Sequence, residues 1–67
     1  MTRLVQVFGM TCENDRKTII LGLEEHEGIR KITVRLPNRI VEIDFNEKVI
    51  TLEEIKMIIQ KLGYDPI

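Results

Sequence analysis

The sequence has a single cysteine, Cys12, and no tryptophan among its 67 residues. One cysteine cannot form an internal disulfide, so no covalent cross-link contributes to the stability of this small domain. No apolar run exceeds three residues, which excludes a membrane-spanning helix and the apolar core of a secretion signal. We therefore expect a cytoplasmic protein whose thiol stays reduced.

Aromatic residues and excess charge are also scarce. Phe8, Phe45 and Tyr64 are the only aromatic residues, too few for a sheet that stacks nucleic-acid bases. Ten basic and eleven acidic residues are interspersed and give a net charge of −1, so no basic patch is available for a phosphate backbone. Nucleic acid and membrane insertion are thus excluded from the expected partners.

Hydrophobic periodicity predicts six elements in one domain, residues 1–67. The predicted strands are 4–8, 29–36, 39–45 and a short one at 64–67, and the predicted helices are 15–25 and 52–62. Thr51 and Glu54 form a capping box before the second helix. This order is that of an α+β, ferredoxin-like βαββαβ sandwich, in which two helices cover one face of a four-stranded antiparallel sheet. Since the chain starts at Met1 and ends on a short strand, we expect a stand-alone protein.

Three residues refine this picture. Gly22 interrupts the first helix, and we expect it to permit a close approach to the sheet. Gly28 is expected to end that helix in a left-handed conformation, and Pro66 to confine the last strand to an edge. The apolar residues expected to face outward are Leu4, Phe8, Leu21 and Met57.

Cys12 lies where the first strand pattern gives way to a helix pattern. Unpaired backbone N–H groups and the positive end of the helix dipole gather at a helix start, and both favour a thiolate. Such a thiolate is either a soft metal ligand or a nucleophile. An enzymatic role is disfavoured, because no second cysteine can resolve an intermediate and no histidine lies within reach to act as base.

The residues Gly9-Met10-Thr11-Cys12 resemble the heavy-metal-associated domain of copper chaperones and of metal-pumping ATPases. The signature of that family is Gly-Met-Thr/Asp-Cys-x-x-Cys, and Asp15 stands here where the second cysteine belongs. Gly28-Ile29 and Gly63-Tyr64 fall where the family also places a glycine followed by an aliphatic residue and a glycine followed by an aromatic residue. The resemblance implies a small metallochaperone that binds Cu(I), or alternatively Zn(II) or another soft divalent ion, and passes it to a metal-transporting ATPase or another metal-handling protein.

Asp15 changes what this site can bind. Thiolates favour monovalent copper and carboxylates favour harder ions, so Cys12 and Asp15 as metal ligands form an incomplete copper site. A second copy of the chain can supply the missing sulfur, through a weak homodimer at the Cys12 loop, and so can a small thiol or a partner's cysteine. The alternative is a degenerate homologue that binds no metal and acts as an interaction or regulatory module.

The residues around Cys12 are expected to support the site without binding the ion. The resemblance implies that Met10 packs in the core beneath the loop, and methionine commonly fills irregular gaps there. Thr11 completes the loop. The resemblance places Tyr64 where the family has an aromatic residue beside its site, so we expect Tyr64 to shield Cys12, to donate a hydrogen bond to its sulfur, or simply to pack. His26 lies about 20 Å along the helix from Cys12, so we expect a partly covered surface residue and not a shared ligand.

Overall fold

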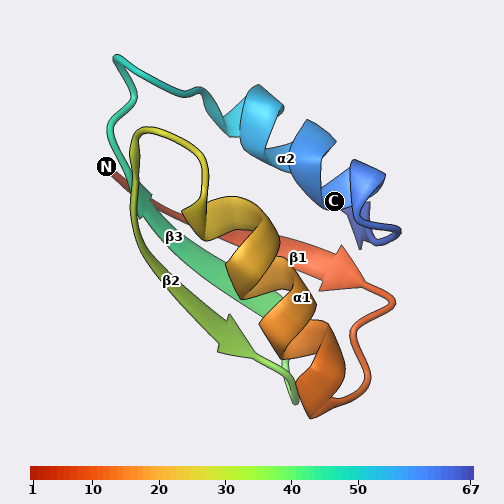
Figure 1. Ribbon diagram of the computed structural model, residues 1–67. Coiled ribbons are helices and arrows are strands. Elements are labelled where there is room, and N and C mark those ends of the chain that lie inside the picture. The colour runs from red at the N-terminus through yellow and green to blue at the C-terminus, as the bar shows by residue number, and fades with distance from the viewer.

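The computed structural model describes all residues, Met1–Ile67, and confirms the predicted architecture. The elements in chain order are β1 (Thr2–Phe8), α1 (Glu13–Glu24), β2 (Ile29–Arg35), β3 (Ile40–Phe45), α2 (Leu52–Lys61) and β4 (Asp65–Pro66). Figure 1 shows both helices on the same side of a twisted sheet. Neither helix has the length and apolar character that crossing a membrane requires.

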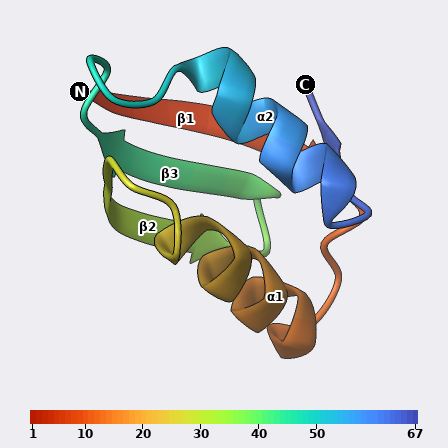
Figure 2. The ribbon, with the colours of Figure 1, turned by 45° about the horizontal axis from the view of Figure 1, so that its top comes forward.

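The strands form one antiparallel sheet in the order β2-β3-β1-β4. Val41 of β3 lies opposite both Val5 of β1 and Val34 of β2. Pro66 of β4 lies opposite Val7, so the proline is on the predicted edge strand, where its missing N–H costs no ladder hydrogen bond. The second view shows one face of the sheet covered by α1 and α2 (Figure 2).

The core fills the space between the sheet and the helices. Its members are apolar side chains that are at least 95% buried, and no polar side chain lies among them. They are Val5, Val7, Met10, Ile19, Leu23, Val34, Val41, Ile43, Phe45, Ile50, Ile55 and Ile59. The outward-facing apolar residues were predicted correctly, since Leu4, Phe8, Leu21 and Met57 are all exposed.

The element boundaries differ slightly from the predicted ones. Helix α1 begins at Glu13 because Cys12 is its N-cap, with an extended backbone and a carbonyl that accepts a hydrogen bond from the Arg16 N–H at 3.3 Å. Strand β3 begins at Ile40, because Arg39 has a positive φ of 56° and its N–H donates to the Leu36 carbonyl to close the turn. Local turn geometry therefore set these ends, which apolar periodicity does not resolve.

The capping box before α2 is present as predicted. The Glu54 N–H donates to Thr51 Oγ1 at 3.2 Å, and Glu54 Oε1 accepts from the Thr51 N–H at 3.3 Å. These two hydrogen bonds satisfy backbone donors that the first turn of a helix otherwise leaves unpaired.

The predicted contact of Gly22 with the sheet is wrong. A Cβ atom at Gly22 would lie 2.6 Å from Leu62 Cδ1, at the end of α2. The glycine therefore accommodates a side chain from the other helix. Hydrophobic periodicity predicts which face of a helix is buried, but not which neighbouring element packs against that face.

Gly28 and Gly63 allow the energetic cost of backbone strain to be separated from that of side-chain crowding. Both have positive φ values, 95° and 101°, which cost an L-residue about 1–2 kcal/mol. A Cβ at Gly28 would also lie 3.0 Å from side-chain atoms of Ile50 and Val49, whereas nothing lies within 4 Å at Gly63. We expect Gly63→Ala to lower the free energy of unfolding in urea by about 1 kcal/mol, and Gly28→Ala by roughly twice as much. Equal losses would show that crowding at Gly28 has no energetic effect.

Candidate metal site

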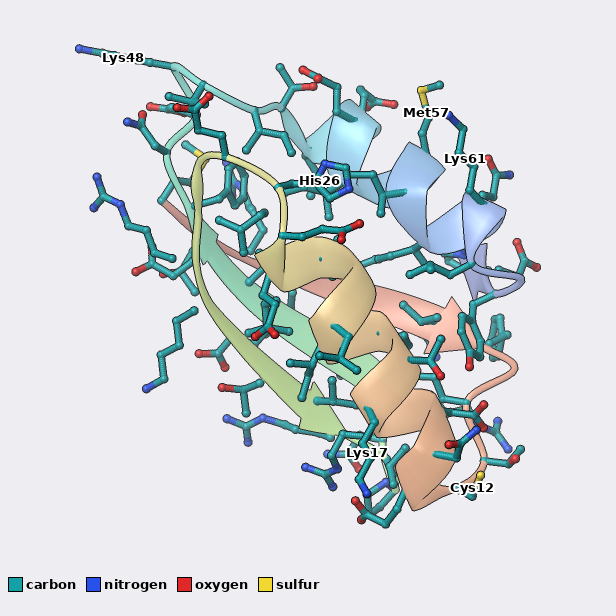
Figure 3. The ribbon with its side chains drawn as sticks, viewed as in Figure 1. Cys12, Lys17, His26, Lys48, Met57 and Lys61 are labelled. Atoms are coloured by element: carbon teal, nitrogen blue, oxygen red, sulfur yellow. The ribbon has the colours of Figure 1, made fainter.

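Cys12 lies at the tip of the loop between β1 and α1, and its side chain is exposed. Figure 3 shows its sulfur at the end of the molecule where α1 begins. Gly9, at the start of this loop, has a φ of 103°, which lets the chain turn sharply out of β1. The fold thus presents one thiol where an ion or a second molecule can reach it.

Asp15 lies one helical turn beyond Cys12, and its carboxylate is the centre of a hydrogen-bond cluster. Oδ2 accepts from the Thr11 N–H at 2.8 Å, the Thr11 hydroxyl at 3.2 Å and the Cys12 N–H at 3.2 Å, and the Cys12 thiol donates to it at 3.6 Å. Oδ1 accepts from the Tyr64 hydroxyl at 2.6 Å. The two site residues expected to bind metal are therefore adjacent, and one of them is already engaged by several donors.

This arrangement is a helix-capping geometry that the sequence analysis missed. Asp15 is the third residue of α1, and it accepts from the N–H of the N-cap residue, as Glu54 does in α2. The spacing of Cys12 and Asp15 equals that of Thr51 and Glu54, so the signal was present in the sequence. Because the resembled motif has a cysteine at this position, Asp15 was interpreted only as a metal ligand, and its role at the helix start was not predicted.

Tyr64 is brought to this site by the connection between α2 and β4, which lies beside the Cys12 loop in both ribbon views (Figures 1 and 2). Its hydroxyl donates to Asp15 and not to the Cys12 sulfur. Of the expected roles of Tyr64, the hydrogen bond to sulfur is therefore wrong. Its ring packs against the core and beside Gly9, where a Cβ would lie 3.3 Å from the ring. Tyr64 therefore joins two loops that are far apart in the sequence.

The electrostatics of the cluster follow from these contacts. The Tyr64 hydroxyl, followed by the backbone N–H groups of Thr11 and Cys12, holds the pKa of Asp15 well below its usual range. Burial, and then the hydrogen bond to Asp15 and its charge, raise the pKa of Tyr64 above 10.0. At neutral pH, Asp15 is therefore an anion and Tyr64 a neutral donor.

Met10 is only 2% exposed and lies in the core beneath the loop, which confirms its predicted packing role. Its sulfur is thus withdrawn from solvent. Met10 anchors its part of the chain in the core, and Thr11 makes two hydrogen bonds to Asp15.

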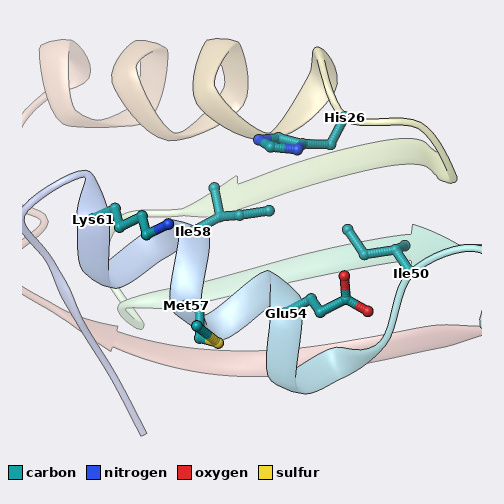
Figure 4. Close-up of a pocket in the computed structure, with 6 residues that line it drawn as sticks. All are labelled: His26, Ile50, Glu54, Met57, Ile58 and Lys61. Atoms are coloured by element: carbon teal, nitrogen blue, oxygen red, sulfur yellow. The ribbon is translucent and has the colours of Figure 1, made fainter.

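His26 is partly covered, as predicted, and lies at the opposite end of α1 from Cys12 (Figure 3). It borders an open groove of about 200 Å³ between the helices, shown in Figure 4. The other lining residues are Ile50, Glu54, Met57, Ile58 and Lys61. Nowhere in the chain do three or more histidine, cysteine or acidic side chains gather as a metal cluster would require.

The surface next to the Cys12 loop contains one notable contact. The Arg39 guanidinium lies 6.0 Å from the centre of the Phe8 ring, and Phe8 is 37% exposed. The Val7 N–H donates to the Arg39 carbonyl at 2.7 Å, which holds the turn between β2 and β3 against the end of β1. An aromatic ring and a cation therefore flank the loop on the open face of the sheet.

Comparison with known proteins places this fold and loop in a family. The chain matches the heavy-metal-associated domain over residues 4–65. It is 41% identical to the probable copper-exporting P-type ATPase of Archaeoglobus fulgidus over 64 residues. These residues are 96% of this chain and 8% of the ATPase. It is 30% identical over 63 residues to the copper chaperone CopZ of Staphylococcus epidermidis, which covers 94% of this chain and 93% of the chaperone.

The chain therefore belongs to the heavy-metal-associated domain family. A solved CopZ metallochaperone matches it over the full length of both chains, with a TM-score of 0.97 at 22% identity, and this likeness shows the fold. The chain spans almost all of one kind of curated relative, the chaperone, and only a small part of the other, the ATPase.

The hydrogen bonds to Asp15 predict a specific response to acid. Because the pKa of Asp15 is lower in the folded chain than the 3.8 of an unperturbed carboxyl, its stabilisation is complete above about pH 4 and is lost as the pH falls further. Thermal unfolding midpoints measured from about pH 7 down to about pH 2 should therefore decrease less in Asp15→Asn than in the wild-type protein. Tyr64→Phe, which keeps the carboxylate but removes its strongest donor, should fall between the two. Identical profiles for all three proteins would contradict the assignment.

Proposed function

We propose that this protein is a small metal-binding protein of the metallochaperone type, which binds a soft ion such as Cu(I) through Cys12. The observation that carries this proposal is the position of the sulfur: exposed, at a helix start, in the loop where the family signature Gly9-Met10-Thr11-Cys12 is retained. A cysteine sulfur at that place is a soft ligand, and soft ligands favour monovalent copper. Zn(II) suits the site less, because a structural zinc ion takes four ligands.

The second ligand is proposed to come from outside the chain. Cys12 is the only cysteine, and the carboxylate of Asp15 is a harder ligand that is already engaged by Thr11, Cys12 and Tyr64. An exposed sulfur can be reached by the cysteine of a second copy, of a partner protein or of a small thiol. A homodimer bridged by an ion at the Cys12 loop is one form of this arrangement.

The partner is proposed to be a metal-transporting ATPase or another metal-handling protein. The relatives that support this are named as a copper chaperone and a copper-exporting ATPase. Transfer of the ion would proceed by ligand exchange, with a cysteine of the acceptor joining Cys12 on the ion before Cys12 leaves it. No bond of a substrate is made or broken, so the proposed role is transport and not catalysis. The cytoplasmic location stays a prediction.

The alternative is a metal-independent interaction or regulatory module. The observation that favours it is Asp15 itself, since a carboxylate at the position of the second cysteine has become part of the helix cap. In this case the family fold would be retained for docking, with Phe8 and Arg39 beside the loop as the exposed contact residues.

Titration with Cu(I) against a competing chelator distinguishes the two functions. For the reduced wild-type protein we expect binding near one ion per two chains, because linear copper takes two sulfurs and each chain supplies one. Cys12→Ala should abolish binding. Met57→Leu, which removes an exposed sulfur far from the loop, should bind as the wild type does. Failure of the wild-type protein to compete with micromolar chelator would favour the metal-independent module.

Restoring the second sulfur provides a complementary test. Asp15→Cys places two thiols in the spacing of the family signature, so both can bind one ion without a second molecule. We expect its Cu(I) affinity to rise by at least about 100-fold and its stoichiometry to shift to one ion per chain. Asp15→Ser, which removes the carboxylate without adding sulfur, is the matched control and should show no such gain. A variant Asp15→Cys with wild-type affinity would mean that the loop cannot bring both sulfurs to one ion.

A further inference from the structure

Both oxygens of Asp15 accept hydrogen bonds from donors of its own chain. Oδ1 accepts from Tyr64 at 2.6 Å, and Oδ2 accepts from two backbone N–H groups and one hydroxyl, with the Cys12 thiol nearby. A carboxylate offers about four lone-pair sites. An ion bound to Oδ2 would therefore displace hydrogen bonds that are charge-assisted and among the stronger kinds in proteins, and an ion bound to Oδ1 would compete with the Tyr64 hydroxyl for the same oxygen.

The capping box of α2 shows which of these contacts are special. Glu54 accepts from the N–H and the hydroxyl of Thr51, at 3.3 and 3.1 Å, and has no partner outside its own helix start. Asp15 makes the equivalent contact with Cys12 but also reaches Tyr64, 49 residues away. The start of α1 is thereby tied to the connection between α2 and β4, which a capping role alone does not require.

We infer that Asp15 is a positioning residue for Cys12 and not a ligand of the ion. It holds the backbone N–H groups of Thr11 and Cys12 and, through Tyr64, joins this loop to the neighbouring one, so that the sulfur is presented while the carboxylate stays in place. This inference rests on the proposed binding of a soft ion by Cys12. Its consequence is that the ion, when bound, has sulfur ligands only, and that Asp15 keeps its hydrogen bonds from the Thr11 and Cys12 N–H groups and from Tyr64 in the loaded protein.

The positioning role is tested without metal, by amide hydrogen exchange measured by NMR. Asp15→Ala should accelerate exchange of the Thr11 and Cys12 amides by about tenfold, as expected for the loss of a hydrogen bond to a charged acceptor. The conservative Asp15→Asn should give a smaller acceleration, and it serves if the alanine variant unfolds. Glu54→Ala is the matched control and should affect Thr51 alone. Unchanged exchange at Thr11 and Cys12, or an equal effect of Glu54→Ala on them, would overturn the positioning role.

The ligand question is tested on Cu(I)-loaded protein by X-ray absorption spectroscopy. We expect sulfur alone in the first coordination shell of the wild-type protein, and the same shell in Asp15→Asn. An oxygen neighbour that is present in the wild type and absent from Asp15→Asn would make Asp15 a ligand and overturn the inference. A wild-type protein that takes up no Cu(I) would instead overturn the proposed function, while the exchange measurements would still decide whether Asp15 positions the loop.

Discussion

The carboxylate of Asp15 connects the features that define the candidate site. It accepts from the loop that carries Cys12, caps the helix that follows, and receives the hydroxyl of Tyr64 from the far end of the chain. Because hydrogen bonds to an ionised carboxylate are among the stronger kinds in proteins, one side chain can hold three segments together. Asp15 thus has a structural role at the start of α1, next to the only sulfur that the loop exposes.

Most of the fold could be predicted from local patterns. The alternation of Val41, Ile43 and Phe45 places them on the inner face of the sheet, and the helical spacing of Ile55 and Ile59 places them in the same core. The capping box at Thr51 was also readable, since it involves residues only three apart. Gly22 was misassigned because its neighbour, Leu62, comes from another helix, and sequence spacing carries no information about such a contact.

The candidate site was only partly predictable for the same reason. Cys12 and its place at a helix start follow from the change of periodicity, and the proximity of Tyr64 follows from the topology of the fold. That Tyr64 donates to Asp15 and not to the sulfur could not be predicted, because it depends on a contact between residues 49 apart and on the orientation of two side chains. The capping role of Asp15, by contrast, could have been predicted from its spacing from Cys12. It was not predicted, because the same residues were interpreted as part of a metal-binding motif.

The pairing of Tyr64 with Asp15 also provides an intrinsic optical probe. Tyr64 is the only tyrosine in a chain without tryptophan, so the near-ultraviolet phenolic band arises from a single side chain at the site itself. Any event that breaks its hydrogen bond to Asp15 alters the environment of that one chromophore. The state of the loop can therefore be followed by the ultraviolet signal of Tyr64, without a label.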